Sequence, residues 1–412
     1  IIDLLIRTQP CNTARKSNIF AQSHIRFANL KLNQMTTKII KISAIALALC
    51  FLCSACKNDD EPAPIPTPEC RRTILLYVVA ANSLGNSGYD KTDIEDVLKF
   101  AKNNSLNDCR IIVYHSNYEL AAPELFEITK DGSSSAKKTI KTYSNEPGAS
   151  VTIDRMKEVF SDMTQLYKSK EYELILWSHA TAWAASMQNA PNKTFGQDRG
   201  FEMPILELAQ AIPDNLFHTI NFDACYMASV EVAYELRNKA QFMIASPTEV
   251  LGKGMPYELV MSDYVATELK PENIAKTVFD YYNTQSSQRY CTISVVKLSA
   301  IPDLAQICKQ IKAAALPDPA LSSMQYYNRQ LSPFLIDFAQ YYTTISPSDE
   351  ATRQFNDALA NAVVYKAATP RFSTLIIDPD NFSGLSTYML NTSTPQNDAT
   401  YRTLSWHLLI NG

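Results

Sequence analysis

The stretch Ile74-Leu75-Leu76-Tyr77-Val78-Val79-Ala80 is a continuous apolar run with several β-branched residues. A strand with one face in water alternates apolar and polar residues, whereas a strand buried on both faces is apolar throughout. Strands of the second kind belong to parallel sheets that helices cover on both sides. The run therefore predicts an α/β fold.

Further apolar strands follow this run, separated by segments with helical periodicity. Strands are expected at 110–114, 172–177, 218–222, 241–245 and 290–296, and helices at 93–102, 153–167, 203–211, 227–238, 271–282, 303–315 and 353–365. A hairpin carrying Asp131-Gly132 fits 119–143, and a closing strand pair is expected near 374–377 and 385–389. This alternation predicts a mostly parallel sheet with helices on both faces.

The N-terminal region has the pattern of a targeting segment rather than of a fold. Residues 1–34 precede the first methionine and are interpreted as upstream sequence without a structural role. A short basic start and the apolar run Ile42–Leu52 follow, and that run is too short to span a membrane stably. Residues 35–56 are therefore predicted to be a signal peptide.

The end of this segment, Leu52-Cys53-Ser54-Ala55-Cys56, resembles a bacterial lipobox, with Cys53 where Leu is usual. Cys56 is the predicted lipid attachment, and a plain cleaved signal peptide is the alternative. Residues 57–70 are the predicted tether: an acidic stretch, similar to the export signal of Bacteroidetes surface lipoproteins, and then alternating prolines. These features predict an outer-membrane lipoprotein of the cell envelope that meets the membrane only through its anchor.

The composition excludes some classes of partner. The chain has 412 residues, 38 Lys and Arg, 42 Asp and Glu, and a net charge of −4. Without a basic excess or a basic run, nucleic acid is not an expected partner. One domain is expected from residue 71 to 412, with a C-terminal elaboration from about residue 271 that packs on the same sheet, and the protein is expected to be a monomer.

Two apolar strands end in residues that can carry chemistry. His179 follows the strand at 172–177, and Cys225 follows the strand at 218–222. The carboxyl ends of parallel strands open onto one edge of the sheet, where ligands bind. A thiolate nucleophile needs an imidazole that carries protons to and from the leaving amine. The sequence therefore predicts a Cys–His pair at this edge.

The two blocks Trp177-Ser178-His179-Ala180 and Phe222-Asp223-Ala224-Cys225-Tyr226-Met227 resemble the signature of the clostripain family, in the clan of caspases, legumain and gingipains. The resemblance implies a caspase/haemoglobinase-like fold and a secreted cysteine endopeptidase that acts on proteins or peptides. It implies Cys225 as nucleophile and His179 as general acid and base. The backbone N–H groups of Ala180 and Cys225 would form the oxyanion hole.

The same resemblance implies cleavage after Arg, and less readily after Lys. Asp223 would lie beside the pocket for that basic side chain, and Glu249 could supply a second carboxylate. In the alternative interpretation, Asp223 only caps the helix that begins near Met227. Many relatives cut themselves after a basic residue between the dyad members, which makes Lys193 and Arg199 candidate autoprocessing sites.

One departure from the family pattern bears on activity. Ala180 stands where the family has Gly, and an Ala at positive φ costs about 1 kcal/mol and would displace the oxyanion donor. Ala182 poses a milder form of the same question. The alternative function is therefore an inactive surface lipoprotein that acts as a binding module, and a weaker one is glycan capture.

No metal or other cofactor is required by the residues, since no Cys/His cluster has zinc-ligand spacing. Calcium is implied by the family resemblance alone, without an EF-hand loop. Cys70 and Cys109 each precede a predicted strand, so a disulfide and two free thiols are both open. Cys291 and Cys308 are interpreted as packing residues.

Overall fold

The computed structural model describes residues 69–184, 195–329, 335–390 and 395–412. The signal peptide, Cys56 and nearly all of the tether lie outside these ranges. The described residues from Glu69 onward belong to one compact unit, Pro66–Gly412. Its centre is a nine-stranded sheet with the order β12-β10-β9-β8-β5-β1-β2-β3-β4. The strands are β1 Cys70–Ala80, β2 Cys109–Asn117, β3 Glu124–Asp131, β4 Ser134–Thr142, β5 Ser169–Trp177, β8 Phe217–Asp223, β9 Ala240–Ala245, β10 Thr292–Lys297 and β12 Val363–Ala368.

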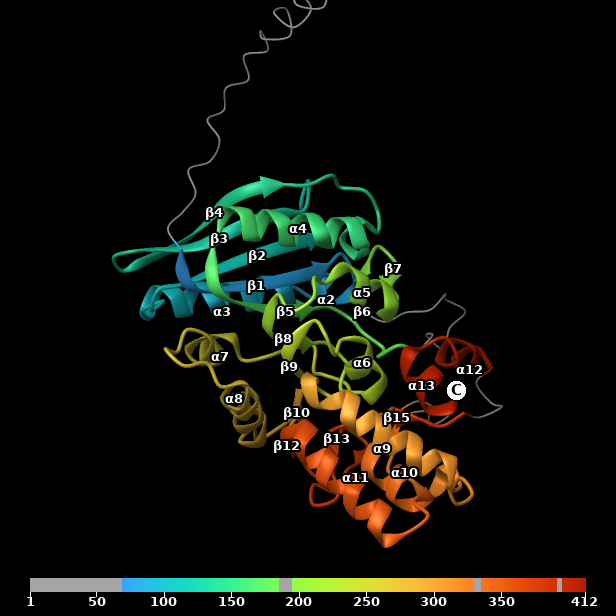
Figure 1. The fold of residues 1–412 in the computed structure, drawn as a ribbon. Coiled ribbons are helices and arrows are strands. Elements are labelled where there is room, and N and C mark those ends of the chain that lie inside the picture. Colours follow the sequence, from blue (N-terminus) through green and yellow to red (C-terminus); the bar gives the residue numbers. More distant parts are fainter. Residues whose placement is uncertain (1–68, 185–194, 330–334, 391–394) are drawn as a thin grey trace, which may run out of the picture. The chain divides into compact units, whose positions relative to one another are not determined.

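The middle of this sheet is parallel. The pairs β9–β8, β8–β5, β5–β1 and β1–β2 are parallel, and both edges continue with antiparallel strands (Figure 1). The sequence-based prediction of a mostly parallel sheet is confirmed. The predicted hairpin is β3–β4, and Gly132 in its turn has φ 57°, a conformation that favours glycine.

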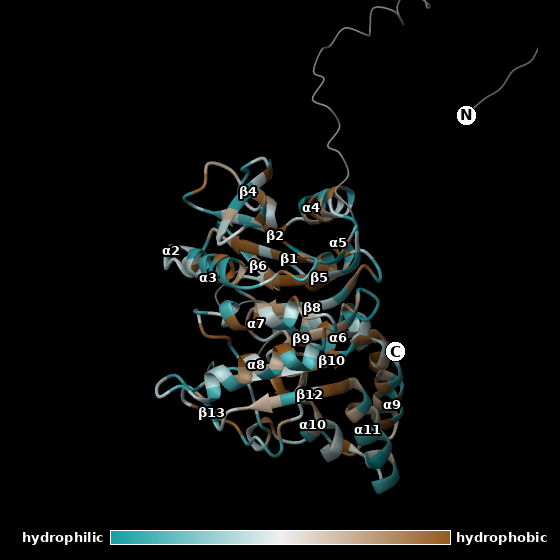
Figure 2. Cartoon of the chain, turned by 90° about the vertical axis from the view of Figure 1, so that its left-hand side faces the viewer, coloured by the Kyte–Doolittle hydropathy of each residue, from teal (hydrophilic) through white to brown (hydrophobic). Residues whose placement is uncertain are grey.

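Helices cover both faces, as predicted. Alternate residues of β1 point into two separate cores: Ile74, Leu76 and Val78 into one, Leu75, Tyr77 and Val79 into the other. Figure 2 shows these central strands as hydrophobic along their length. The first core is closed by α3 Tyr89–Asn103, α7 Tyr257–Tyr264 and α8 Pro271–Asn283, and the second by α4 Ile153–Leu166, α5 Ile205–Ala211, α6 Val230–Glu235, α9 Ile301–Ala313, α10 Phe338–Ile345, α11 Asp349–Ala362 and α13 Ser405–Asn411.

Three expected elements differ from the structure. The helix expected at 353–365 ends at Ala362, because the chain then joins the sheet edge as β12. The helix expected at 227–238 is only α6, because the Ala228 N–H donates to the Ser246 carbonyl and Ser229 caps the helix instead. The expected closing strand pair is wrong: β14 Leu375–Ile376 pairs with β13 Arg371–Phe372, and β15 Ser386–Tyr388 pairs with β11 Leu335–Asp337.

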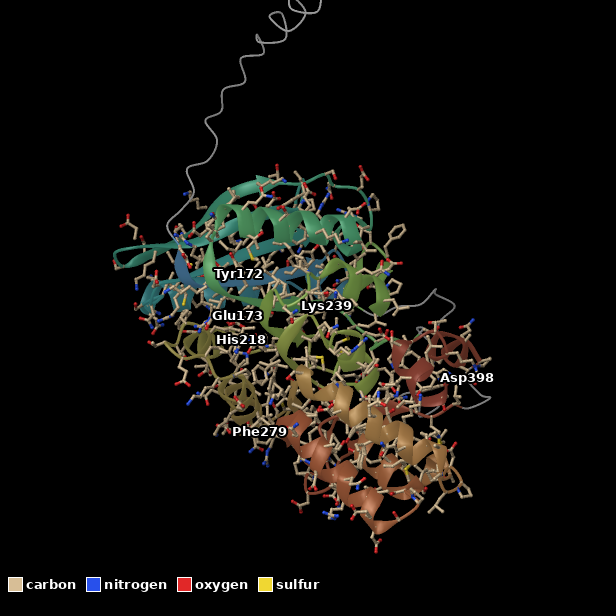
Figure 3. The ribbon with its side chains drawn as sticks, in the orientation of Figure 1. Tyr172, Glu173, His218, Lys239, Phe279 and Asp398 are labelled. Carbon is tan, nitrogen blue, oxygen red and sulfur yellow. The ribbon has the colours of Figure 1, made fainter. Side chains whose placement is uncertain are left out.

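A buried carboxyl group of β5 lies beside the amino-terminal half of β8. Glu173 is fully buried and accepts hydrogen bonds from the Thr219 backbone and hydroxyl. His218 Nδ1 lies 3.3 Å from Glu173 Oε1, and Figure 3 shows the two side chains together. Burial lowers the pKa of His218, but the hydrogen bond and charge of Glu173 outweigh burial and raise it above its usual value. These contacts join β5 to β8 far from the carboxyl ends.

The cysteines of the described unit are free thiols. Cys70 and Cys109 are both buried and form no disulfide, which answers the question left open by the sequence. Cys291 and Cys308 are buried in the two cores, as expected of packing residues. None of the helices in the described residues is long and apolar enough to cross a membrane.

Candidate active site

The carboxyl ends of β5 and β8 lie side by side. Trp177, the last residue of β5, is in register with Asp223, the last residue of β8, and with Val78 of β1. The chain leaves β5 through His179 and leaves β8 through Cys225. Both residues line one cavity of about 100 Å³. The other residues around it are Leu84, Trp177, Ser178, Asp223, Ala224, Val250, Leu251, Gly252 and Gly254.

The Cys225 thiol is half-buried at this cavity, and the Val250 N–H donates to its sulfur at 3.3 Å. Burial raises the pKa of Cys225 to about 12, and the charges of Glu249 and Asp223 also raise it. The Val250 N–H and the charge of Arg329 act in the opposite direction. The thiol is therefore protonated at neutral pH, so a nucleophile can form here only if a neighbouring base accepts the proton.

The His179 segment is held against β6 Phe195–Asp198. The Gly196 N–H donates to the His179 carbonyl at 2.9 Å, and Ala180 forms a bridge with Phe195. In a planar trans peptide the carbonyl and the following N–H point in opposite directions. The Ala180 N–H is thus directed away from β6. His179 itself contacts Ser83, with 2.8 Å between Nε2 and the Ser83 Oγ.

Ala180, which stands where the family has Gly, does not have a left-handed backbone conformation. Positive φ near the site occurs at Ala182 (61°) and at Tyr226 (66°), and Ala180 is not among the residues with positive φ. A non-Gly residue in this region costs about 1–2 kcal/mol. The departure at Ala180 therefore carries no such strain, and the backbone strain near the site is located at Ala182 and Tyr226 instead.

Asp223 lies in the cavity wall and is buried. Its Oδ2 accepts hydrogen bonds from the Met255 N–H at 3.0 Å and from the Tyr257 hydroxyl at 2.9 Å. Gly254 approaches so closely that a Cβ there would lie 2.5 Å from Oδ2. Burial raises the pKa of Asp223 to about 6, although both donors lower it. The following helix is capped by Ser229, so the capping interpretation of Asp223 has no support in these contacts.

A second buried carboxyl group lies close to Asp223. Asp93, on α3, accepts a hydrogen bond from the Trp177 indole at 2.7 Å. Burial, and then the charge of Asp223, raise the pKa of Asp93 to about 9, so it is neutral at pH 7. The sequence did not single out Asp93, because acidic residues are common in the first turn of a helix.

Glu249 is on the loop after β9 and forms an ion pair with Arg329. The pKa of Tyr226 is raised mainly by burial and then by the charge of Glu249, and a hydrogen bond to Glu249 adds to this effect. Glu249 is not among the residues that line the cavity of His179 and Cys225. Arg329 was also missed by sequence reasoning, because it lies far along the chain in a segment without a recognisable motif.

Of the two candidate autoprocessing residues, Lys193 lies outside the described residues. Arg199 lies in the turn between β6 and β7 Phe201–Met203, with φ 52°. Its N–H donates to the Ala81 carbonyl at 2.8 Å, and its guanidinium binds Asp198 and the Asn145 side chain. Arg199 is therefore held in a structured turn.

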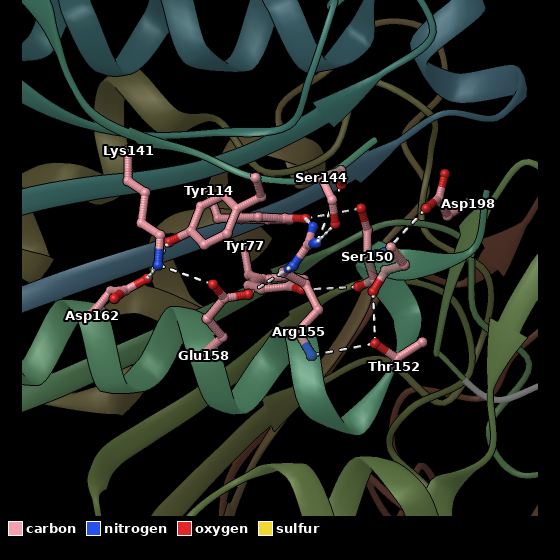
Figure 4. Close-up of polar contacts among 12 residues, drawn as sticks. Tyr77, Tyr114, Lys141, Ser144, Ser150, Thr152, Arg155, Glu158, Asp162 and Asp198 are labelled. Atoms are coloured by element: carbon pink, nitrogen blue, oxygen red, sulfur yellow. Dashed lines mark hydrogen bonds and ion pairs between the residues drawn. The ribbon is translucent and has the colours of Figure 1, made fainter. Parts of the chain in front are cut away.

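Asp198, in the Phe195–Asp198 block, is a structural anchor for this turn. The Ser150 N–H donates to Asp198 Oδ2 at 3.1 Å, and the Tyr77 hydroxyl donates to the Ser150 carbonyl at 2.9 Å (Figure 4). Tyr114 and Ser150 share a hydroxyl contact of 2.9 Å. These bonds fix β6, which in turn holds the His179 backbone.

The described residues contain no group of three or more His, Cys, Asp or Glu side chains placed to hold a metal ion. This finding neither supports nor excludes the calcium ion implied by the family resemblance, since backbone carbonyl oxygens also bind calcium, and no chemical step is derived through one.

Comparison with known proteins identifies the family and agrees with the fold. The model of the clostripain family matches residues 76–382. An inactive zymogen C11 protease from Parabacteroides distasonis is 28% identical, with a TM-score of 0.72 over 84% of this chain and 99% of its own. A secreted C11 cysteine protease from Bacteroides thetaiotaomicron, in complex with an irreversible peptide inhibitor, is 29% identical, with a TM-score of 0.73 over 83% and 99%. No curated protein has a matching sequence.

Proposed function

The chain belongs to the clostripain family of cysteine proteases, and we propose that it is an endopeptidase that cleaves after Arg, and less readily after Lys, with Cys225 and His179 as its dyad. The observation that carries this proposal is the shared cavity of His179 and Cys225 at the ends of two neighbouring parallel strands. Its substrates are proteins or peptides.

In the proposed reaction, His179 accepts the thiol proton as the Cys225 sulfur attacks the scissile carbonyl carbon. The oxyanion is stabilised by the backbone N–H groups of Ala180 and Cys225. The imidazolium then returns its proton to the leaving amine as the C–N bond breaks and a thioester remains. Water, deprotonated by His179, attacks the thioester and releases the carboxylic acid and the thiol.

Specificity for a basic residue is assigned to Asp223. Its carboxylate lies in the wall of the same cavity and is ionised above its pKa of about 6. A guanidinium that enters the cavity can pair with it, and low exposure strengthens such a charge-assisted bond. Glu249 is assigned a secondary role, because it is already paired with Arg329.

Matched fluorogenic peptides with Arg, Lys, Gln or Asp before the scissile bond test the proposal. We expect the order Arg, Lys, and then much lower but measurable rates for Gln and Asp. Cys225→Ala and His179→Ala should abolish cleavage, whereas Cys291→Ala, which removes another thiol, should retain it. Equal rates for Arg and Gln would contradict the specificity, and full activity of His179→Ala would contradict the dyad.

The alternative, an inactive homologue that serves as a binding module, is favoured by the surroundings of the nucleophile: burial raises the pKa of the Cys225 thiol to about 12. An irreversible chloromethyl ketone peptide ending in Arg separates the two functions. An active enzyme is labelled at Cys225, and the label is lost in His179→Ala. A binding module binds the peptide reversibly without labelling.

We further propose that residues 35–56 are a lipoprotein signal peptide and that Cys56 carries the lipid, which would place the enzyme at the outer membrane. Palmitate labelling should be lost in Cys56→Ala and retained in Cys53→Ala.

For activation, we propose autoprocessing at Lys193 rather than Arg199, since Arg199 is held by Asp198 and Asn145. Mass spectrometry of fragments from the wild type, Lys193→Ala and Cys225→Ala tests this.

A further inference from the structure

The third group at the dyad is a serine hydroxyl from a different strand end. We propose that Ser83 is a positioning residue, which binds His179 through Nε2 and so assigns proton exchange with Cys225 to Nδ1. The inference rests on the proposed function, because it concerns the same His179. The inference is based on the 2.8 Å contact between Ser83 Oγ and His179 Nε2.

Ser83 is placed by the end of β1. It is the first residue of the short helix α2 Ser83–Asn86, and the preceding Asn82 caps that helix. The Asn82 Oδ1 accepts from the Leu84 N–H at 2.9 Å and from the Gly85 N–H at 3.4 Å. At Gly85 a Cβ would lie 1.8 Å from the Ala80 carbonyl oxygen, so this tight turn requires glycine. The hydroxyl therefore projects from a backbone with a defined conformation.

The residues that precede Ser83 and His179 are bonded to each other. The Asn82 Nδ2 donates to the Val79 carbonyl at 2.9 Å, to Ser178 Oγ at 3.3 Å and to the Gln197 carbonyl at 2.8 Å. The Ser178 hydroxyl donates to the same Val79 carbonyl at 2.7 Å. Asn82 and Ser178 are both buried. This frame ties the ends of β1 and β5 together, so the Ser83–His179 distance is set by buried contacts.

The chemistry of the contact follows from the two ring nitrogens. A neutral imidazole carries its proton on one nitrogen and a lone pair on the other, and the imidazolium carries protons on both. A hydroxyl that accepts from Nε2–H can keep this bond in both states. The lone pair of the neutral ring is then on Nδ1, which becomes the base toward Cys225. A serine hydroxyl can donate or accept, and the role proposed for Ser83 is to accept from Nε2–H, which stabilises this tautomer and limits ring rotation without adding charge.

Kinetics test this role with a matched control. Ser83→Ala should lower kcat for an Arg peptide about 3- to 10-fold, the value of one neutral hydrogen bond, with KM unchanged. Ser83→Thr retains the hydroxyl and should restore most of kcat. Ser87→Ala removes the hydroxyl that bonds the Ser83 carbonyl in the same turn, and it should match the wild type. Wild-type kcat in Ser83→Ala, or no rescue by Thr, would overturn the inference.

Nitrogen-15 spectra of the imidazoles provide a readout that does not depend on cleavage. In a Cys225→Ala background, His179 should be protonated at Nε2 and unprotonated at Nδ1, and adding Ser83→Ala should produce a mixture of tautomers. An unchanged tautomer would overturn the inference. The two proposals fail separately: activity in His179→Ala refutes the dyad, whereas an inactive His179→Ala with fully active Ser83→Ala refutes only the role of Ser83.

Discussion

Arg329 and Glu249 form an ion pair that joins the segment before β11 to the loop after β9, beside the Cys225 thiol. The Arg329 guanidinium also lies 3.4 Å from the Ser373 hydroxyl and 5.9 Å from the centre of the Phe372 ring. Its charge lowers the pKa of Cys225, while that of Glu249 raises it. A substrate cation that uses Glu249 must therefore replace an internal arginine.

Arg329→Met should change both substrate affinity and thiol reactivity. The unpaired Glu249 becomes available to a substrate cation, so KM should fall for the Arg peptide and not for the Gln peptide. Loss of the positive charge should also raise the pKa of Cys225 further, which slows alkylation by iodoacetamide at fixed pH. Arg353→Met, which breaks an exposed ion pair on α11, is the control and should change neither. A KM that changes equally for both peptides would contradict this prediction.

Cleavage after Arg should depend on pH through Asp223. Because its pKa is raised to about 6, the carboxylate is largely protonated at pH 5 and ionised at pH 7, so KM for the Arg peptide should fall over this interval. The Tyr257 hydroxyl lowers that pKa by donating to the carboxylate, so Tyr257→Phe should move the transition to higher pH. KM profiles of the Arg and Gln peptides from pH 4.5 to 8 measure this. A transition of the same size in Asp223→Asn would refute the assignment.

Asp93 should make the protein less stable as pH rises. Its pKa is about 9 when folded and about 4 when unfolded, so between these values the folded chain binds one more proton. The free energy of unfolding therefore falls with pH across this window. Asp93→Asn keeps an acceptor for the Trp177 indole and removes the titration. Urea unfolding at pH 5 and pH 8 should show a smaller decrease in the variant, and equal decreases would contradict the raised pKa.

A side chain at position 254 should impair substrate binding, in addition to the strain that positive φ imposes on any residue other than glycine. Gly254 and Gly132 have φ of 60° and 57°, so Ala at either position should cost about 1 kcal/mol of stability. A Cβ at 254 would also collide with Asp223, whereas nothing lies within 4 Å of a Cβ at 132. Gly254→Ala should raise KM for the Arg peptide several-fold, and Gly132→Ala should leave it unchanged. Thermal unfolding and KM, measured on both variants, separate the two effects.

Much of the fold was predictable from local pattern. The apolar run at Ile74–Ala80 became an inner strand of the sheet, because a strand without polar residues must be covered on both faces. Predictions were weaker near the C-terminus. Thr374–Ile377 and Leu385–Met389 both resemble strands, but they pair with separate partners. Strand pairing depends on contacts between distant segments, so the local sequence pattern of a strand does not determine which strand it pairs with.

The sequence by itself determined the family, the alternation of strands and helices, and the two strand ends that carry His179 and Cys225. These features depend on residue type and spacing, which the chain displays directly. Only the tertiary structure decided that Ser83 meets His179, that Asp93 lies close to Asp223, and that Arg329 binds Glu249. Each pair joins segments far apart in the chain, and its chemistry depends on distance and burial. Those two quantities exist only after the sheet has assembled.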